Sequence, residues 1–322
     1  MRALVTGGAG FIGSHLVEAL LEKDYTVRIL DDFSTGKREN LLAYQNEVEI
    51  FEGDLADQKV VFQAVEGVNC IFHMGAIPSV VRSVEDPFRV HQANVQGTLN
   101  VLLAARQMKV KRVVYSSSSS IYGDQPTLPK EESMKPDPIS PYAATKLAGE
   151  VYSSVFYSVY RVPTVSLRYF NVFGPRQDPG SLYSAVIPRF IDRLVDEKPP
   201  TIYGDGMQTR DFTYVGDVVR ANLLACDASD HVLGKSYNIA CGKFVSLLEL
   251  LNQIQEIINV KVSPVFESAR SGDIRDSWAS IEAAERDLNF KPVTSLAQGL
   301  KKTIDWFSLR KKSCDANQTQ GA

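Results

Sequence analysis

The chain has 322 residues, 44% of them hydrophobic, and a formal net charge of −3 at pH 7. This length allows one large α/β domain or two smaller ones with a full hydrophobic core. The near-balanced charge favours neither nucleic acid nor a membrane surface as a partner, and no apolar run approaches the length of a membrane span. Because the first predicted strand begins at once, there is no room for a signal peptide, and we expect a cytoplasmic protein. The scattered cysteines lack metal-ligand spacing, so no metal site is predicted at Cys70, Cys226, Cys241 or Cys314.

The N-terminal stretch combines an apolar strand over residues 2–6, a glycine-rich turn, an amphipathic helix over 14–21 and a second strand that ends in two acids. Gly7 permits a tight turn out of the strand, Gly10 leaves room for a pyrophosphate beside the backbone, and Gly13 lets the helix pack close to the sheet. The helix N-terminus would offer free N–H groups and a positive dipole end to phosphates. Together these features predict a dinucleotide-binding site.

The acids that end the second strand, Asp31 and Asp32, indicate which dinucleotide binds. Asp31 is placed to accept hydrogen bonds from the 2′-hydroxyl of an adenosine ribose, and its charge would repel a 2′-phosphate. No arginine follows at once to receive such a phosphate, since Lys37 and Arg38 come later. NAD is therefore favoured over NADP as the cofactor.

The first half of the chain alternates between strands and helices. Apolar runs predict buried strands at 48–51, 70–73, 112–116 and 164–168, with helical patterns between them at about 57–66, 87–108 and 141–160. This alternation predicts a doubly wound parallel sheet with helices on both faces. Ligands of such sheets bind beyond the carboxyl ends of the strands, which would gather at one edge Gly7, Asp31, Asp54, 73–76, 116–120 and 169–171.

The alternation breaks after Asn171, where a loop rich in glycine and proline begins. We expect a strand over 201–203 and helices near 187–196, 217–227, 247–258, 280–287 and 296–307. This half is predicted to form a smaller α/β lobe that closes over the sheet edge. The expected boundaries are a dinucleotide-binding domain at 1–171 plus about 212–240, a substrate-binding lobe at about 172–211 and 241–310, and a disordered polar tail at 311–322.

The segment that begins helix 141–160 carries candidate acid–base chemistry. Ser140 suits the N-cap and Pro141 the first helical position. Tyr142 and Lys146 then lie one turn apart on the same helix face. An ammonium near a phenol favours the phenolate, and an oxidised nicotinamide would add positive charge. Tyr142 is therefore predicted to act as a base near neutral pH.

Five consecutive serines, 116–120, follow strand 112–116 at the ligand-binding edge, where their hydroxyls can bind a substrate hydroxyl and relay its proton. Some of them are expected to bond their own backbone. With Gly7-x-x-Gly10-x-x-Gly13 and Tyr142-x-x-x-Lys146, this cluster resembles the extended short-chain dehydrogenase/reductase family. More narrowly it resembles the nucleotide-sugar C4-epimerases of the UDP-glucose/UDP-N-acetylglucosamine 4-epimerase type. The similarity extends to residues 51–55, 93–98, 168–176, 209–215 and 270–275.

The resemblance implies a Rossmann-like domain and a role for each matching residue. Ser118, Tyr142 and Lys146 would be the catalytic trio. NAD would be held by Gly7, Gly10, Phe11, Ile12, Gly13, Asp31, Asp32, Ser34, Thr35, Gly36, Asp54, Leu55, Met74, Gly75, Ala76, Asn94, Ser116, Tyr142, Lys146 and Phe170. A UDP-sugar would be held by Ser79, Ser118, Tyr142, Asn171, Ala185, Val186, Tyr203, Arg210, Arg270, Asp273 and Ser277. Two arginines suit a diphosphate, because guanidinium is permanently charged and forked.

The serine cluster also indicates the reaction. The sister 4,6-dehydratases of this family carry Thr-Asp-Glu where this chain has Ser118, Ser119 and Ser120. A serine hydroxyl cannot replace the carboxyl pair that eliminates water. Sister decarboxylases carry a glutamate in place of Ser120. The cluster therefore favours simple epimerisation at C4 through a 4-keto intermediate.

The choice of sugar is predicted from the wall of the pocket near C2. In the family, a large residue at the position of Ser277 excludes an N-acetyl group and a small one admits it. Ala185 and Val186 also resemble the epimerases of N-acetylated sugars. We therefore expect UDP-GlcNAc/UDP-GalNAc to be accepted alongside UDP-glucose/UDP-galactose.

Two alternative functions and the oligomeric state remain open at this point. Arg82 and Arg275 are candidates to meet a carboxylate, as in a UDP-uronate 4-epimerase or decarboxylase. A non-catalytic NAD-binding regulatory protein is the alternative of another class. Relatives pair helix 141–160 with helix 87–108 in a dimeric four-helix bundle, and the apolar surface of helix 141–160 predicts a homodimer.

Overall fold

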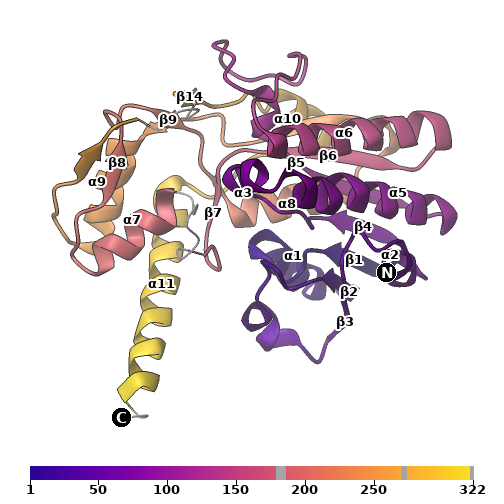
Figure 1. Ribbon diagram of the computed structural model, residues 1–322, viewed down its shortest axis with the longest axis horizontal. Helices are drawn as coiled ribbons and strands as arrows, with labels where there is room; N and C mark the ends of the chain where they lie inside the picture. Colours follow the sequence, from indigo (N-terminus) through magenta and orange to yellow (C-terminus); the bar gives the residue numbers. More distant parts are fainter. Residues whose placement is uncertain (179–185, 270–273, 320–322) are drawn as a thin grey trace.

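The computed structural model describes residues 1–178, 186–269 and 274–319, with side chains up to residue 311. Its centre is a seven-stranded sheet in the order β11-β6-β5-β4-β1-β2-β3, in which every neighbouring pair is parallel (Figure 1). The strands are β1 Arg2–Thr6, β2 Thr26–Asp31, β3 Val48–Glu52, β4 Cys70–His73, β5 Arg112–Ser118, β6 Thr164–Tyr169 and β11 Ser236–Ile239. The order reverses direction beside β1, which confirms the predicted doubly wound sheet.

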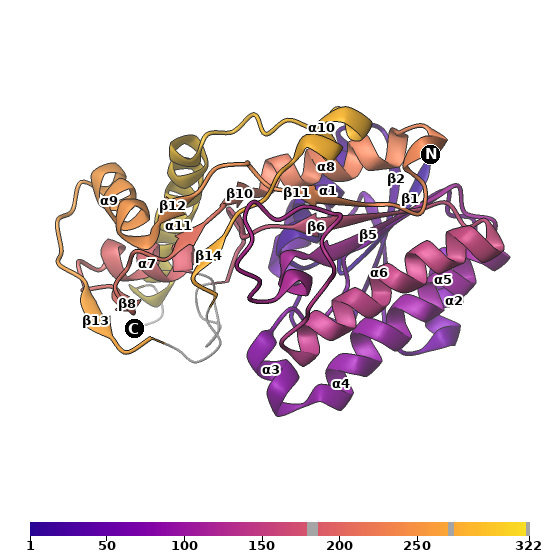
Figure 2. The same cartoon turned by 90° about the horizontal axis from the view of Figure 1, so that it is seen from above.

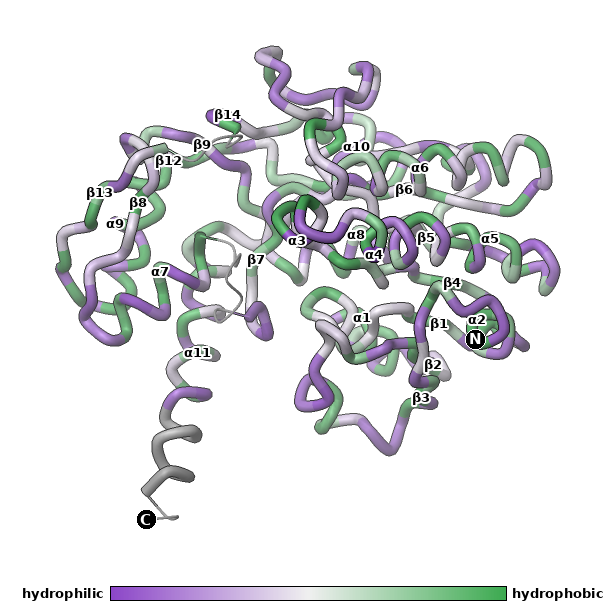
Figure 3. Tube along the Cα trace, viewed as in Figure 1, coloured by the Kyte–Doolittle hydropathy of each residue, from purple (hydrophilic) through white to green (hydrophobic). Residues whose placement is uncertain are grey.

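Helices cover both faces of this sheet (Figure 2). One face carries α1 Phe11–Leu21, α8 Val215–Asp227 and α10 Glu282–Leu288, and the other carries α2 Gln58–Val65, α5 Gly97–Gln107 and α6 Pro141–Tyr160. Successive strand residues serve opposite cores, since Leu4 packs in one and Val5 in the other. Figure 3 shows the matching alternation of hydrophobic and hydrophilic residues along α5 and α6.

The helix expected over 87–108 is confirmed as an unbroken helical run with one irregularity. The structure has α4 Pro87–His91, a π-helical turn over Gln92–Gln96 and then α5, with a further short helix α3 Val80–Glu85 before them. The sequence did not predict the π turn, where the Asn94 side chain bonds to both main-chain groups of Ile77. A π turn inside a helix often marks a functional site.

A second, smaller unit lies beside the large sheet (Figures 1 and 2). It packs α7 Val186–Val195, α9 Leu247–Ile258 and α11 Leu296–Thr319 around its own apolar core. Its short strands are β7 Val172–Phe173 with β10 Thr213–Tyr214, β8 Thr201–Tyr203 with β13 Val265–Glu267, and β9 Thr209–Arg210 between β12 Val245–Ser246 and β14 Asp276–Ser277.

Two segments differ from their expected places. Helix α10 was assigned to the lobe, yet Ala284 and Leu288 pack in the core of the large sheet. The expected disordered tail from residue 311 is helical as far as Thr319, as the end of α11. No proline or glycine interrupts residues 300–319, and Lys311 forms an ion pair with Asp196 after α7.

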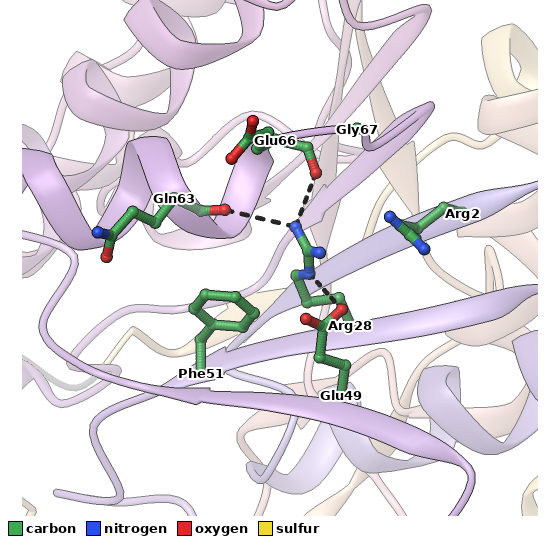
Figure 4. A pocket seen from close by; sticks show the side chains of 7 residues that line it. All are labelled: Arg2, Arg28, Glu49, Phe51, Gln63, Glu66 and Gly67. Carbon is green, nitrogen blue, oxygen red and sulfur yellow. Dashed lines mark hydrogen bonds and ion pairs between the residues drawn. The ribbon is translucent and has the colours of Figure 1, made fainter.

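A cleft of about 660 Å³ lies near the amino ends of the strands, at the end of the sheet opposite to the glycine turn (Figure 4). Arg28 fills much of its wall. Its Nη1 donates to the carbonyls of Ala64 at 2.7 Å and Glu66 at 2.8 Å, and its Nε donates to Glu49 at 2.8 Å. Arg28 thus caps the carboxyl end of α2, and its role is structural.

Candidate active site

The glycine turn between β1 and α1 is built for close approach. Gly7 has φ +68°, and a Cβ there would lie 2.8 Å from the backbone of Gly75. A Cβ at Gly13 would lie 2.1 Å from the carbonyl oxygen of Gly7. At Gly10 a Cβ would meet only that same oxygen at 3.1 Å, so the protein leaves space on the outer side. No side chain caps α1, which leaves its first-turn N–H groups for a ligand, and a pyrophosphate fits this cradle.

The two strand-ending acids take different positions. Asp31 is almost fully buried and holds the turn together, accepting from the N–H groups of Ala9 and Phe33, both at 2.9 Å. Burial raises the pKa of Asp31, and these two hydrogen bonds oppose the rise. Each of its oxygens keeps a further lone pair for a ribose hydroxyl. Asp32 is more exposed and accepts from the N–H and hydroxyl of Ser34.

His73 lies in a buried chain of hydrogen bonds beneath this turn. The hydroxyl of Thr6 accepts from Gly75 N–H and lies 2.7 Å from His73 Nδ1. On the other side, His73 Nε2 lies 3.0 Å from the hydroxyl of Thr98, which donates to the carbonyl of Asn94. Because Thr98 gives its proton to Asn94, its hydroxyl accepts from His73, so Nε2 carries a proton and a neutral ring accepts from Thr6 at Nδ1. Burial lowers the pKa of His73 to about 3, which agrees with that state.

Asn94 extends this chain of hydrogen bonds to α6, which carries Tyr142 and Lys146. Its Nδ2 donates to the hydroxyl of Thr145 at 3.0 Å, and that hydroxyl donates to the carbonyl of Tyr142 at 2.8 Å. The resemblance predicted Asn94 only as a cofactor residue. The support from His73, Thr98 and Thr145 was missed, because no sequence pattern links side chains so far apart in the chain.

The predicted trio does come together at the carboxyl end of β5. Ser140 caps α6 by accepting from Ala143 N–H at 3.1 Å, which sets Tyr142 in the first turn. The Ser118 hydroxyl lies near enough to the Tyr142 phenol to lower its pKa, and Ser120 donates to Ser118 at 2.9 Å. One turn further, Lys146 is buried and donates to the carbonyl of Ser116 at 2.8 Å.

Burial shifts the pKa values of both ionisable members of this trio. Burial raises the pKa of Tyr142, and the hydrogen bond from Ser118 opposes the rise only in part. Burial also lowers the pKa of Lys146 to about 8, and its ammonium points at the Ser116 carbonyl. Desolvation of Tyr142 thus opposes the phenolate, so the predicted base depends on the positive charges of Lys146 and of an oxidised nicotinamide together.

Other predicted residues take defined places around this centre. Phe170, predicted to contact the nicotinamide, is fully buried and its ring packs against that of Tyr122. Asn171 donates to the carbonyl of Asp211 at 3.0 Å. Ser79 caps α3, whose Ser83 accepts from Tyr142 N–H at 3.0 Å. These contacts bring α3 against the start of α6.

The predicted diphosphate and sugar residues are partly described. Arg210 on β9 is the register partner of Ser277 on β14, so these two lie side by side. Arg210 donates to the carbonyls of Ile274 and Arg275 at 2.5 and 2.9 Å. Tyr203 ends β8, and Val186 begins α7. Ala185, Arg270 and Asp273 lie outside the described residues.

Comparison with known proteins agrees with this geometry. Residues 3–240 match the NAD dependent epimerase/dehydratase family. The chain is 39% identical over 311 residues to the UDP-glucose 4-epimerase of Mycolicibacterium smegmatis, which spans 95% of this chain and 98% of that protein. The UDP-N-acetylglucosamine 4-epimerase of Methanobrevibacter ruminantium, solved with UDP-N-acetylmuramic acid, has a TM-score of 0.92 at 38% identity and covers 96% and 98% of the two chains. The UDP-glucose 4-epimerase of Thermus thermophilus, solved with NAD, has a TM-score of 0.87 at 38% identity and covers 96% and 99%.

The fold and the site together define an NAD-dependent enzyme of the short-chain dehydrogenase/reductase type. The chain belongs to the NAD-dependent epimerase/dehydratase family. NAD is its cofactor, as the acid after β2 predicted. No helix among the described residues is long and apolar enough to cross a membrane.

Proposed function

We propose that this protein inverts C4 of UDP-hexoses through a transient 4-keto sugar. The observation that carries the proposal is the convergence of Ser118, Tyr142 and Lys146 at the carboxyl end of β5. Hydroxyls stand beside them where a dehydratase needs carboxyl groups, since Ser120 donates to Ser118. The names of the most similar relatives support a UDP-sugar substrate.

In the proposed reaction the chain binds, orients and moves a proton. NAD⁺, when bound, supplies a reversible hydride acceptor at C4. Ser118 bridges the substrate 4-hydroxyl to Tyr142, whose phenolic oxygen takes the proton and later returns it. Lys146 holds positive charge near that oxygen and is itself oriented by the Ser116 carbonyl. Arg210, on β9 of the lobe, is proposed to hold the diphosphate while the keto sugar turns to present its other face.

The test of the reaction follows a label on C4. The purified protein should interconvert UDP-glucose and UDP-galactose without a net change in oxidation state. Deuterium at C4 of UDP-glucose should remain in the product, because the same hydrogen is removed and returned within the site. Loss of that label to solvent would contradict the proposal. UDP-glucuronate should be assayed in parallel, because turnover of that compound alone would favour a uronate enzyme.

The structure gives that uronate alternative little support. Arg82 is exposed on α3, and Arg275 is exposed and ion-paired with Asp205 at 3.1 Å. Neither guanidinium is held near Tyr142 by any hydrogen bond among the described residues. The alternative of a non-catalytic NAD-binding protein would be favoured if no UDP-sugar turns over while NAD remains bound.

We further propose that N-acetylated sugars are accepted, because a small residue, Ser277, stands beside Arg210. Replacing Ser277 by Tyr should lower kcat/KM for UDP-GlcNAc by about 10–100-fold, since one overpacked side chain costs about 1–3 kcal/mol. The value for UDP-glucose should change by less than about threefold. Steady-state rates on both substrates measure this. Ser277→Ala is the matched control and should keep both activities; equal losses on both sugars in Ser277→Tyr would contradict the assignment.

We also propose a homodimer formed by the outer face of α6. Val151, Val155, Val159 and Tyr160 are each between 42% and 61% exposed on that helix. A contiguous apolar face of this kind favours burial against a second copy. Val155→Glu should shift the protein from dimer to monomer in size-exclusion chromatography with light scattering. Val293→Glu, at a still more exposed valine on another segment, should leave the dimer intact, and a wild-type monomer would end the proposal.

A further inference from the structure

A bridge of three charged side chains joins the carboxyl ends of β2 and β3. Arg89 on α4 forms ion pairs with Asp54 through Nη1 at 2.9 Å and with Asp32 through Nη2 at 3.3 Å. All three side chains are about one-third exposed, at 35%, 39% and 31%. The bridge therefore lies at the protein surface, next to the site proposed for the adenosine ribose.

Each carboxylate in the bridge is fixed from both sides. The second oxygen of Asp32 accepts from the N–H and hydroxyl of Ser34 at 2.9 and 2.6 Å. The second oxygen of Asp54 accepts from Ala56 N–H at 2.9 Å. The backbone of Arg89 is in turn held by Asp86, which caps α4. The guanidinium is thus clamped between two carboxylates that cannot easily turn away.

The nearby Lys37 and Arg38 form ion pairs with other residues. Lys37, which follows the acids in the sequence, pairs with Asp178 at 3.1 Å. Arg38 pairs with Glu52 and lies over the ring of Phe33. Arg89 differs because its partners are themselves predicted cofactor residues. It is the cation placed to respond to the charge of the bound dinucleotide.

We propose that Arg89 sets the choice between NAD and NADP, and that Asp32 and Asp54 hold its guanidinium away from the 2′-position. In the native protein the bridge orients Asp32 beside the proposed ribose site. With Asp31 and Asp54, three carboxylates then surround a single guanidinium there. A 2′-phosphate would meet net negative charge. When both bridge carboxylates are neutralised, the freed guanidinium becomes a fork that suits phosphate.

The test measures dinucleotide binding and does not depend on any sugar reaction. Bound nucleotide is exchanged for NADH, and the concentrations of NAD⁺ and NADP⁺ that displace half of its fluorescence are compared. The Asp32→Asn/Asp54→Asn protein should gain at least about tenfold in NADP⁺ affinity relative to NAD⁺. Adding Arg89→Met should abolish that gain. Arg89→Met alone should weaken NAD⁺ by about five- to tenfold.

Two controls make the outcome decisive. Asp31→Ser should weaken NAD⁺, and if it does not, the adenosine ribose lies elsewhere and the proposal falls. UDP affinity should stay within about twofold of wild type in every variant, which separates the effect from unfolding and from failure of the sugar assignment. An NADP⁺ gain that persists in the triple variant, or no gain in the double variant, would overturn the proposal.

Discussion

Tyr142→Phe should lower kcat by about 10²–10⁴-fold, the usual contribution of a positioned acid–base group. The substitution removes one oxygen, the phenolic oxygen whose pKa the neighbouring Ser118 hydroxyl lowers. Without it no group at this position takes the proton of the substrate 4-hydroxyl. The fold should be unaffected, because the backbone contacts of Tyr142 with Ser83 and Thr145 remain.

The pH dependence gives this prediction a second readout. Tyr142 must lose its own proton before it can take one, and burial raises its pKa. Because that pKa lies above the ordinary value for tyrosine, wild-type kcat/KM should still be increasing with pH at about 8 and above, with no plateau near neutrality. In Tyr142→Phe the residual rate should lose this dependence. The combination distinguishes a lost base from a general disturbance of the pocket.

A matched control lies on the same helix. Tyr152 is exposed on α6 and has no place in the site, so Tyr152→Phe should leave turnover within about twofold of wild type. NAD and UDP binding to Tyr142→Phe should also stay close to wild type. A Tyr142→Phe enzyme with near-normal kcat would refute the assignment of the base.

The features predicted correctly from the sequence are those that local patterns encode. The period of apolar residues identified the parallel sheet, and Ser140 with Pro141 marked where α6 begins. The tight turn at Gly7 could also be predicted locally, because its φ of +68° is one that few residues other than glycine adopt. The carboxyl edge then follows from topology, because all the strands of the large sheet are parallel.

The features that were missed depend on contacts between distant segments. The π turn before α5 arises where Asn94 reaches Ile77 and Thr145, and helix propensity carries no record of either partner. The raised pKa of Tyr142 depends on how deeply the phenol is packed, which spacing alone does not reveal. Arg89 finds Asp32 only after the strands have assembled.

Another missed feature is the buried pair of Arg168 and Glu150, which ties α6 to the sheet. Arg168 on β6 donates to Glu150 on α6 at 2.6 Å through Nη2, and both residues are about 5% exposed. Arg168 Nη1 also donates to the hydroxyl of Tyr122 at 2.6 Å, and Ser117 donates to Glu150 at 2.8 Å. Burial opposes the charge of Arg168, but Glu150 more than offsets it, so the pKa of Arg168 is raised.

Arg168→Met should therefore destabilise the protein by about 3–5 kcal/mol, because it leaves the Glu150 carboxylate buried without its partner. Urea unfolding followed by fluorescence measures the loss. Arg168→Met/Glu150→Leu should recover a large part of it, since two apolar groups remove the unpaired charge as well.

The matched control is an exposed ion pair of the same chemistry. Lys301 and Asp305 lie 3.0 Å apart on α11 with both side chains more than half exposed. Lys301→Met should cost less than about 1 kcal/mol, because water already screens that pair. If Arg168→Met costs no more than this control, or if the double variant is the less stable of the two, the pair does not anchor α6. The position of Lys146, one turn before Glu150, would then need another explanation.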